Sequence, residues 1–318
     1  MLDINIVLAK VESSYGTDAA PAAATDALIV FDWTPQPVQY DTVQRRIDRG
    51  FAGARPTLNT RPRQQHGFSV ELCGSGTAAT PAKWGSVLLR GCLFGAPNIA
   101  ADVTYPLASG GDDGASLSFY GQKGGTGDLM RMRAQGQRQN AVFNFEEGNF
   151  PYIVFDGIGL LNDLPDATAI SAPTLPVYPD PVEVNSANTT FTLDTYALKL
   201  RSFTLDLGLR PTYRSLVNHR EIIFDSDDGA DRRGINGQIV CELPGLAAKN
   251  YFSAIHGSTP IAMSLVHGTA AGNIVSMASS KLVLGAPTFS TEQRRYMMSV
   301  PYRLVPDAAG NELTLKTA

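Results

Sequence analysis

Charged residues are scarce in this chain. Asp, Glu, Lys and Arg make up 18% of its 318 residues, against about a quarter in an average soluble protein. The 30 acidic residues outnumber the 26 basic ones, which gives a net charge of −4. A general nucleic-acid binder is normally strongly basic, so this class is disfavoured. A low charge density instead suits a protein whose surface is largely covered by neighbours.

Long hydrophobic runs are also missing. No stretch approaches the roughly 18–20 apolar residues that span a bilayer, so we expect no membrane segment. The first residues show neither the basic flank nor the apolar core of a secretion signal. The three cysteines, Cys73, Cys92 and Cys241, are odd in number and follow no metal-binding spacing. We therefore expect free thiols and assembly in a cytoplasm.

Catalytic signatures are absent too. The chain contains no G-x-S-x-G, no H-E-x-x-H, no paired C-x-x-C and no P-loop. Its four histidines are far apart in sequence. We expect no enzymatic activity, no catalytic residue and no cofactor.

One acidic segment is a weak candidate for a metal site. Asp225, Asp227 and Asp231 alternate around a glycine, an arrangement that can wrap a calcium ion. The EF-hand spacing fails, however, because the twelfth position counted from Asp225 is Asn236 instead of glutamate. A solvated acidic turn is the favoured interpretation, and we predict no metal site.

Strand patterns dominate what is present. The 30 glycines and 20 prolines supply many short connections between strands. Alternating polar and apolar residues, typical of half-buried strands, occupy 67–72, 129–133, 142–145 and 198–209. A phase slip at Arg201-Ser202 predicts a β-bulge. Only 82–90 and 247–256 resemble helices, and both end at a glycine. The chain is predicted to be mainly β.

The order of these elements occurs twice. Strand, helix, strand and final strand in the first half fall at 67–72, 82–90, 118–121 and 152–155. Their counterparts fall at 237–243, 247–256, 264–268 and 296–299. The first copy is longer, and we place its extra residues in a Gly- and Asp-rich loop at 97–114. A repeat of this kind indicates a duplicated building block.

The predicted organisation has four parts. Residues 1–30, with an Ala- and Pro-rich tract, are expected to form an extended N-terminal arm. Residues 31–165 form the first strand-rich domain and residues 188–318 the second. Between them, the proline-rich residues 166–187 predict a stiff, extended linker.

The strongest charge feature lies between residues 45 and 66. Its arginines are Arg45, Arg46, Arg49, Arg55, Arg61 and Arg63. Arginine pairs with phosphate, so a nucleic-acid contact is one interpretation. The Arg-Pro steps predict a loop, and arginine is enriched at protein interfaces. A loop that docks on an acidic neighbouring subunit is therefore favoured.

The sequence of the N-terminal region resembles that of a known family. Residues 11–21 read V-E-S-S-Y-G-T-D-A-A-P, and residues 68–72 read F-S-V-E-L. Residues 74–84 then read G-S-G-T-A-A-T-P-A-K-W. These segments resemble the major tail tube proteins of long-tailed bacteriophages. The resemblance covers residues 10–95 most clearly and becomes weaker beyond them.

The resemblance implies a structural protein of the virion tail, assembled in the host cytoplasm. Each of the two tandem domains is then a β-sandwich or barrel with one short flanking α-helix. Subunits of the family form rings around a lumen and the rings stack into a tube, the conduit for genome ejection. The implied partners are other copies of the chain, a tape-measure protein, tail terminator and tail-tip proteins, and double-stranded DNA in transit.

Two domains per chain predict trimeric rings with pseudo-sixfold symmetry. A true hexamer in which residues 188–318 form an outer decoration domain is the alternative. A monomeric two-domain module that binds carbohydrate or a cell surface is a second functional class. The residues expected at contacts between subunits or rings are Ile4, Ile6, Val7, Leu8, Tyr15 and the six arginines. Deletion of residues 2–24 is expected to leave the domains folded and to abolish tube growth.

Overall fold

The computed structural model describes residues 5–47, 50, 53–108, 114–125, 128–225 and 233–318. Strands make up most of its regular structure, so the predicted mainly β class is confirmed. The first half contains β1 (Asn5–Val11), β2 (Ala27–Leu28), β3 (Phe31–Gln44), β4 (Thr57–Glu71), α1 (Lys83–Ser86), the 3-10 helix η1 (Leu88–Cys92), β5 (Asn98–Ile99), β6 (Val103–Tyr105), β7 (Leu117–Lys123), β8 (Met130–Glu146) and β9 (Tyr152–Leu160).

The second half follows after a stretch without helix or strand. It contains β10 (Thr189–Leu193), β11 (Tyr196–Ala197), β12 (Leu200–Asp206), β13 (Pro211–Leu216), β14 (His219–Phe224), β15 (Asn236–Glu242), α2 (Tyr251–His256), β16 (Ile261–His267), β17 (Val275–Leu284), β18 (Thr288–Glu292), β19 (Arg295–Leu304) and β20 (Thr314–Thr317). Both predicted helices are present but shorter than expected. The predicted bulge is confirmed by a register shift between Leu200 and Ser202.

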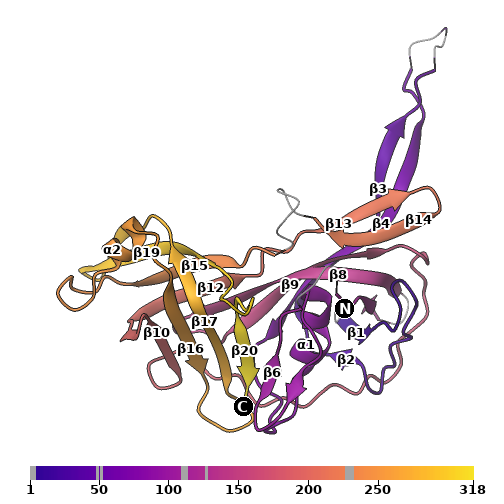
Figure 1. Ribbon diagram of the computed structural model, residues 1–318. Helices are drawn as coiled ribbons and strands as arrows, with labels where there is room; N and C mark the ends of the chain where they lie inside the picture. Colours follow the sequence, from indigo (N-terminus) through magenta and orange to yellow (C-terminus); the bar gives the residue numbers. More distant parts are fainter. Residues whose placement is uncertain (1–4, 48–49, 51–52, 109–113, 126–127, 226–232) are drawn as a thin grey trace.

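Both halves pair their strands in the same scheme. In the first half the antiparallel pairs are β1–β7, β3–β4, β4–β9, β7–β8 and β8–β9. In the second half they are β10–β16, β12–β15, β15–β19, β16–β17 and β17–β19. The repeated order of elements seen in the sequence is therefore a repeat of strand pairing (Figure 1).

The two halves share one sheet and one core. Strand β12 pairs with the end of β8, and β20 pairs with β6, so hydrogen-bonded ladders cross from one half to the other. Buried apolar residues of both halves belong to a single cluster. Trp84, a member of this cluster, is fully buried and donates from its indole nitrogen to the Cys73 carbonyl at 2.7 Å. Cys73, Cys92 and Cys241 are free and buried.

The N-terminal segment differs from the predicted extended arm. Strand β1 pairs along its whole length with β7 and also with β2. Val7, Leu8 and Ala9 are at most 2% exposed, because both faces of this strand are covered. The segment is thus a strand within the subunit, and the prediction of an arm was wrong for residues 5–11.

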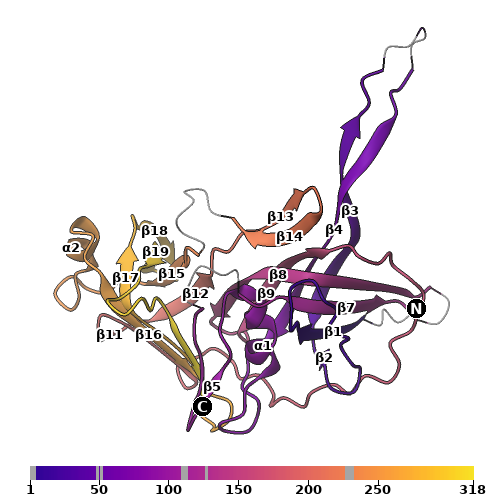
Figure 2. The same cartoon turned by 45° about the vertical axis from the view of Figure 1, so that its right-hand side comes forward.

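The arginine-rich segment differs from the predicted loop as well. Strands β3 and β4 pair from Phe31–Ser69 outward to Gln44–Thr57 and form a long hairpin. Its outer part projects well beyond the rest of the molecule (Figure 2). The extra residues of the first copy also include structure, since β5 and β6 pair with each other and extend the sheet through β20.

The connection between the halves is extended and follows the first half. Among residues 161–188 the structure shows turns and one isolated bridge, between Asp166 and Arg131. Thr174 donates its backbone N–H to the Ala23 carbonyl at 2.9 Å, and Val184 donates to Asn149 at 2.9 Å. These hydrogen bonds fix its path along the surface of the first half.

Candidate assembly surfaces

The projecting part of the β3–β4 hairpin presents apolar side chains to solvent. Val38, Tyr40, Val43 and Leu58 are between 37% and 58% exposed. An isolated two-stranded hairpin is marginally stable in water, so a long one with apolar faces gains most when another surface covers it. The hairpin is the first candidate assembly surface.

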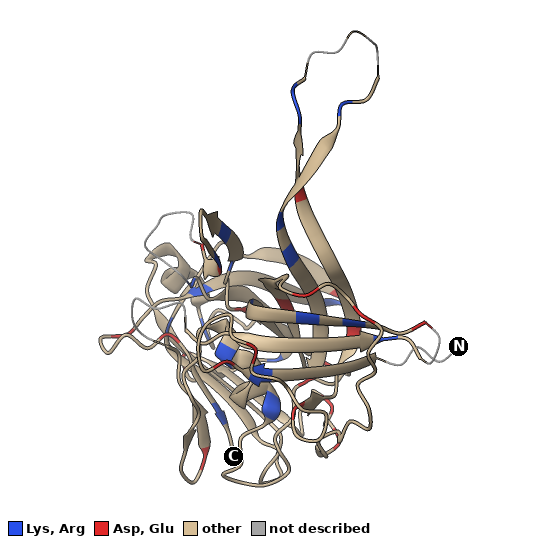
Figure 3. Ribbon diagram, turned by 90° about the vertical axis from the view of Figure 1, so that its right-hand side faces the viewer, with Lys and Arg blue, Asp and Glu red and all other residues tan. Residues whose placement is uncertain are grey.

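The charges on this hairpin are mostly positive. Asp41 accepts from Arg63 at 2.9 Å and lies 3.5 Å from Arg61. The hydrogen bond from Arg63 is the main reason that the pKa of Asp41 lies below its ordinary value. Nearer the tip, Arg45 and Arg55 are exposed, and blue segments in Figure 3 mark basic positions on β4 and on the chain segments that lead to the tip, whereas β3 carries none. Exposed arginines next to apolar side chains are a common composition of protein interfaces.

The predicted contact residues occupy very different positions. Ile6 is half-buried, whereas Val7 and Leu8 are buried inside the subunit and are not available to a neighbour. Arg46 is exposed beside Arg45, and Arg63 is largely covered by Asp41 and the sheet. Ile4 and Arg49 lie outside the described residues.

The N-terminal sequence motif forms a buried polar network within the subunit. The Glu12 carboxylate, 8% exposed, accepts from the backbone N–H of Gly16 and of Gly136, each at 2.8 Å. It also accepts from the hydroxyls of Ser116 at 2.5 Å and Ser118 at 2.9 Å. Four donors on one carboxylate satisfy its buried charge, as a buried ion requires.

Tyr15 joins the two halves of the chain. Its hydroxyl accepts from the backbone N–H of Ile222 in β14, whose carbonyl accepts from Arg138 in β8. The Arg138 guanidinium also lies 4.8 Å from the centre of the Tyr15 ring. Burial raises the pKa of Tyr15 to about 12. Tyr15, predicted at a contact between subunits, therefore holds the β13–β14 hairpin of the second half against the first half.

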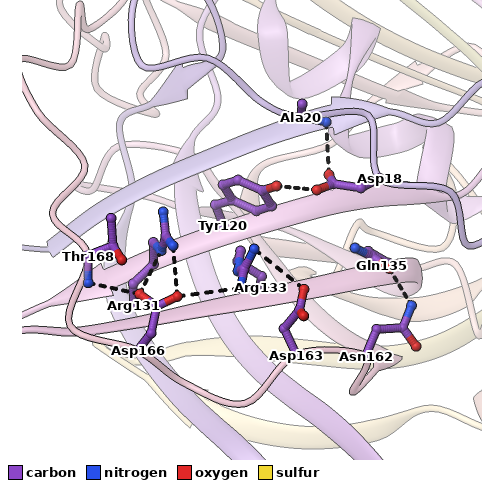
Figure 4. A network of polar contacts seen from close by, with 10 residues as sticks. All are labelled: Asp18, Ala20, Tyr120, Arg131, Arg133, Gln135, Asn162, Asp163, Asp166 and Thr168. Atoms are coloured by element: carbon purple, nitrogen blue, oxygen red, sulfur yellow. Dashed lines mark hydrogen bonds and ion pairs between the residues drawn. The ribbon is translucent and has the colours of Figure 1, made fainter.

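Ion pairs tie the connector to β8, as Figure 4 shows. The Arg131 guanidinium donates to both oxygens of Asp166, at 3.0 and 2.7 Å, and these bonds lower the pKa of Asp166. Arg133 lies 3.4 Å from Asp166 and 3.5 Å from Asp163. On the opposite side of the same network, Tyr120 donates to Asp18. Bidentate pairing is the geometry that gives arginine–carboxylate pairs their specificity.

His66 is a feature that the sequence did not reveal. It is 1% exposed, its ring stacks on that of Phe119 at 3.8 Å, and its Nε2 lies 2.7 Å from the Gln137 amide. Burial lowers the pKa of His66 to about 3. The histidine is therefore neutral in the folded subunit.

Acidification is expected to destabilise the wild-type subunit more than a His66→Gln variant. His66 titrates near 6.5 when unfolded and near 3 when folded, so the unfolded state binds the proton more readily. The contribution of His66 to the free energy of unfolding is complete above pH 6.5 and declines as the pH falls toward 3, by about 1.4 kcal/mol per pH unit. Urea unfolding at several pH values measures this difference, and parallel pH dependences of the two proteins would contradict it.

The candidate metal residues do not form a site in the described part of the chain. Asp225 is exposed and its N–H donates to the Arg210 carbonyl at 3.0 Å, whereas Asp227 and Asp231 lie outside the described residues. No group of His, Cys, Asp or Glu among the described residues has the arrangement of a metal site. Within the same residues, no helix is long and apolar enough to cross a membrane.

The comparisons agree with the resemblance seen in the sequence. A family model described as phage tail tube protein matches residues 4–303, which include both halves and the connector. No curated protein matches the chain. The family match covers nearly the whole chain, and the mainly β fold agrees with it. This chain therefore belongs to the phage tail tube protein family.

Proposed function

We propose that three copies of the chain close each ring of a phage tail tube, so that six similar positions surround the lumen. One observation carries this proposal: the two halves repeat five strand pairings, and β12 of the second half pairs with β8 of the first. Each chain thus contains two building blocks already joined side by side in one sheet. Three such pairs give a ring with pseudo-sixfold symmetry.

The shared sheet favours this arrangement over a hexamer with an outer decoration domain. A decoration domain formed by residues 188–318 needs its own core and a free linker. Here the same residues continue the sheet of the first half and belong to the same buried cluster. A monomeric carbohydrate-binding module has less support, because both tryptophans of the chain, Trp33 and Trp84, are buried, at 5% and 0% exposed.

In this proposal the β3–β4 hairpin connects successive rings. It projects beyond the body of the subunit and carries the exposed arginines and apolar side chains described above. The lumen holds a tape-measure protein during assembly in the host cytoplasm, and terminator and tail-tip proteins close the two ends. A net charge of −4 suits a conduit through which DNA passes without being held.

Shortening the hairpin is expected to abolish tube growth and to leave the subunit folded. Replacing residues 38–63 with Asn-Gly joins Pro37 to Gln64 through a two-residue turn, next to the Gln36–Gln65 pair. Most of the removed residues that the structure describes are exposed, so the thermal unfolding midpoint should change by only a few degrees. Negative-stain microscopy at high protein concentration measures tube formation.

A charge-only variant separates the two contributions of the hairpin. Substituting Arg45, Arg46 and Arg55 with glutamine keeps the apolar side chains and should weaken tube growth, most clearly at low salt. Long tubes from the shortened protein would contradict the role proposed for the hairpin.

A further inference from the structure

We propose that the free edge of β3 pairs with the free edge of β18 in a second copy of this chain, in the register that β12 uses with β8. The proposal rests on the ring proposed above and identifies the contact that closes it. Among the described residues, β3 pairs only with β4 and β18 pairs only with β19. Both strands therefore have an unpaired edge, and unpaired edges are the usual sites of association between sheets.

Strand β3 occupies the same place in the first half as β12 in the second. Thr34 lies opposite Gly67 in β4, and Thr204 lies opposite Gln238 in β15. Gly67 lies four residues before Glu71, the last residue of β4, and Gln238 lies four residues before Glu242, the last residue of β15. Trp33 and Phe203, the preceding residues, are both buried. Thr34 and Thr204 are thus equivalent positions.

Strand β18 likewise occupies the place of the end of β8. Asn144 lies opposite Tyr152 in β9. Tyr152 in turn lies opposite Glu71, the last residue of β4. Ser290 lies opposite Met297 in β19. Met297 in turn lies opposite Glu242, the last residue of β15. Asn144 and Ser290 are therefore equivalent positions.

These equivalences fix the register between two chains. Within one chain, Thr204 lies opposite Asn144. The corresponding contact between chains places Thr34 of one copy opposite Ser290 of the next. The following pair is then Pro35 opposite Phe289. Figure 2 shows β3 and β18 on opposite sides of the molecule, as consecutive contacts around a ring require.

Side-chain burial points to the same contact. Phe143 lies opposite Leu205 of β12 and is 0% exposed. Its equivalent, Phe289, is 51% exposed and lies 6.2 Å from the ring of Phe252, which is itself 37% exposed. The two aromatic rings form an apolar patch at the edge that a neighbour would cover. Burying such a patch is favourable in proportion to the apolar area removed from water.

The prolines of β3 explain how the edge stays unpaired before assembly. Every second residue of β12 points its backbone N–H and carbonyl toward β8. The Leu207 N–H donates to the Ala141 carbonyl at 3.1 Å, and the Glu147 N–H donates to the Arg201 carbonyl at 3.0 Å. By the same alternation, the backbone nitrogens and carbonyls of Pro35 and Pro37 point toward the free edge of β3. Proline has no N–H, so this edge discourages indiscriminate pairing. Contacts to the Phe289 patch therefore contribute strongly to the specific pairing.

Cysteine cross-linking tests this register. Thr34 and Ser290 are exposed in the subunit, and their equivalents form a pair without mutual hydrogen bonds, for which Cα atoms are about 4.5 Å apart, within disulfide range. The Thr34→Cys/Ser290→Cys double variant should assemble under reducing conditions and give covalent trimers on oxidation. Non-reducing electrophoresis, and a short bis-maleimide as a second cross-linker, measure the product. Covalent trimers as the largest species support the register and the three-chain ring together.

Matched controls make the outcomes distinct. The native thiols are buried, and burial raises the pKa of Cys73 and Cys241 to about 12, so the wild-type chain should not cross-link. A Thr42→Cys/Ser290→Cys variant, displaced along β3, should not cross-link either. If the Thr34/Ser290 variant forms tubes without either cross-link, the register is wrong and the tube function stands. If covalent hexamers form, the register stands and the three-chain ring is wrong.

Discussion

Deleting residues 2–24 is expected to give a chain that does not fold. The deletion removes β1, which pairs along seven residues with β7. It also removes Val7, Leu8 and Ala9 from the buried interior, and Glu12 from its four donors. Each buried apolar side chain contributes about 1–3 kcal/mol, so this loss, together with that of the β1–β7 hydrogen bonds and the Glu12 network, is comparable to the whole stability of an ordinary domain, about 5–15 kcal/mol.

Solubility and circular dichroism of the truncated protein measure this result. Lys10→Ala on the same strand is the control, because Lys10 is exposed and the substitution should change the unfolding free energy by no more than about 0.5 kcal/mol. A truncated protein with cooperative unfolding near the wild-type midpoint would contradict the assignment of β1 to the core. It would instead support the extended N-terminal arm that was predicted from the sequence.

Glu12→Gln is expected to lower the unfolding free energy by about 2–4 kcal/mol. One carboxylate oxygen accepts from the Gly16 N–H and the other from the Gly136 N–H. An amide has only one oxygen, so in either orientation its NH2 group faces a backbone N–H. One buried donor then loses its partner, and the negative charge that strengthens the other bonds is lost.

Urea unfolding compares this variant with Glu147→Gln. Glu147 is 55% exposed and pairs with Arg201 at 2.6 Å, and an exposed ion pair contributes at most about 1 kcal/mol. Similar losses for the two variants would show that the Glu12 network does not stabilise the N-terminal segment. The comparison matters because this segment carries the family resemblance, and the network gives it a structural role inside the subunit.

Local patterns in the sequence predicted the elements whose signals are local. The second helix was predicted from the glycine at its end, Gly257, but its start was placed too early, because Asn250, whose side chain caps α2, was counted inside the helix. The slip at Arg201 predicted the bulge because alternation directly reports which face of a strand is buried. The doubled order of elements was visible for the same reason.

Tertiary contacts explain what the sequence did not show. Strand β1 is covered on both faces, so its short apolar run lacks alternation and does not indicate a partner. The β3–β4 hairpin carries prolines at Pro35, Pro37 and Pro62, which favour a loop in sequence yet are tolerated at the edge of a sheet. The contact of Tyr15 with Ile222 joins residues far apart in the chain, and no spacing rule predicts it.

Cryo-electron microscopy of the purified protein at rising concentration tests the three-chain ring. We expect tubes with a central channel, built from rings of three chains that show six similar but unequal positions. The three projecting hairpins of each ring should contact the next ring. Rings of six complete chains, or a protein that stays a compact monomer at all concentrations, would show that the three-chain ring is wrong.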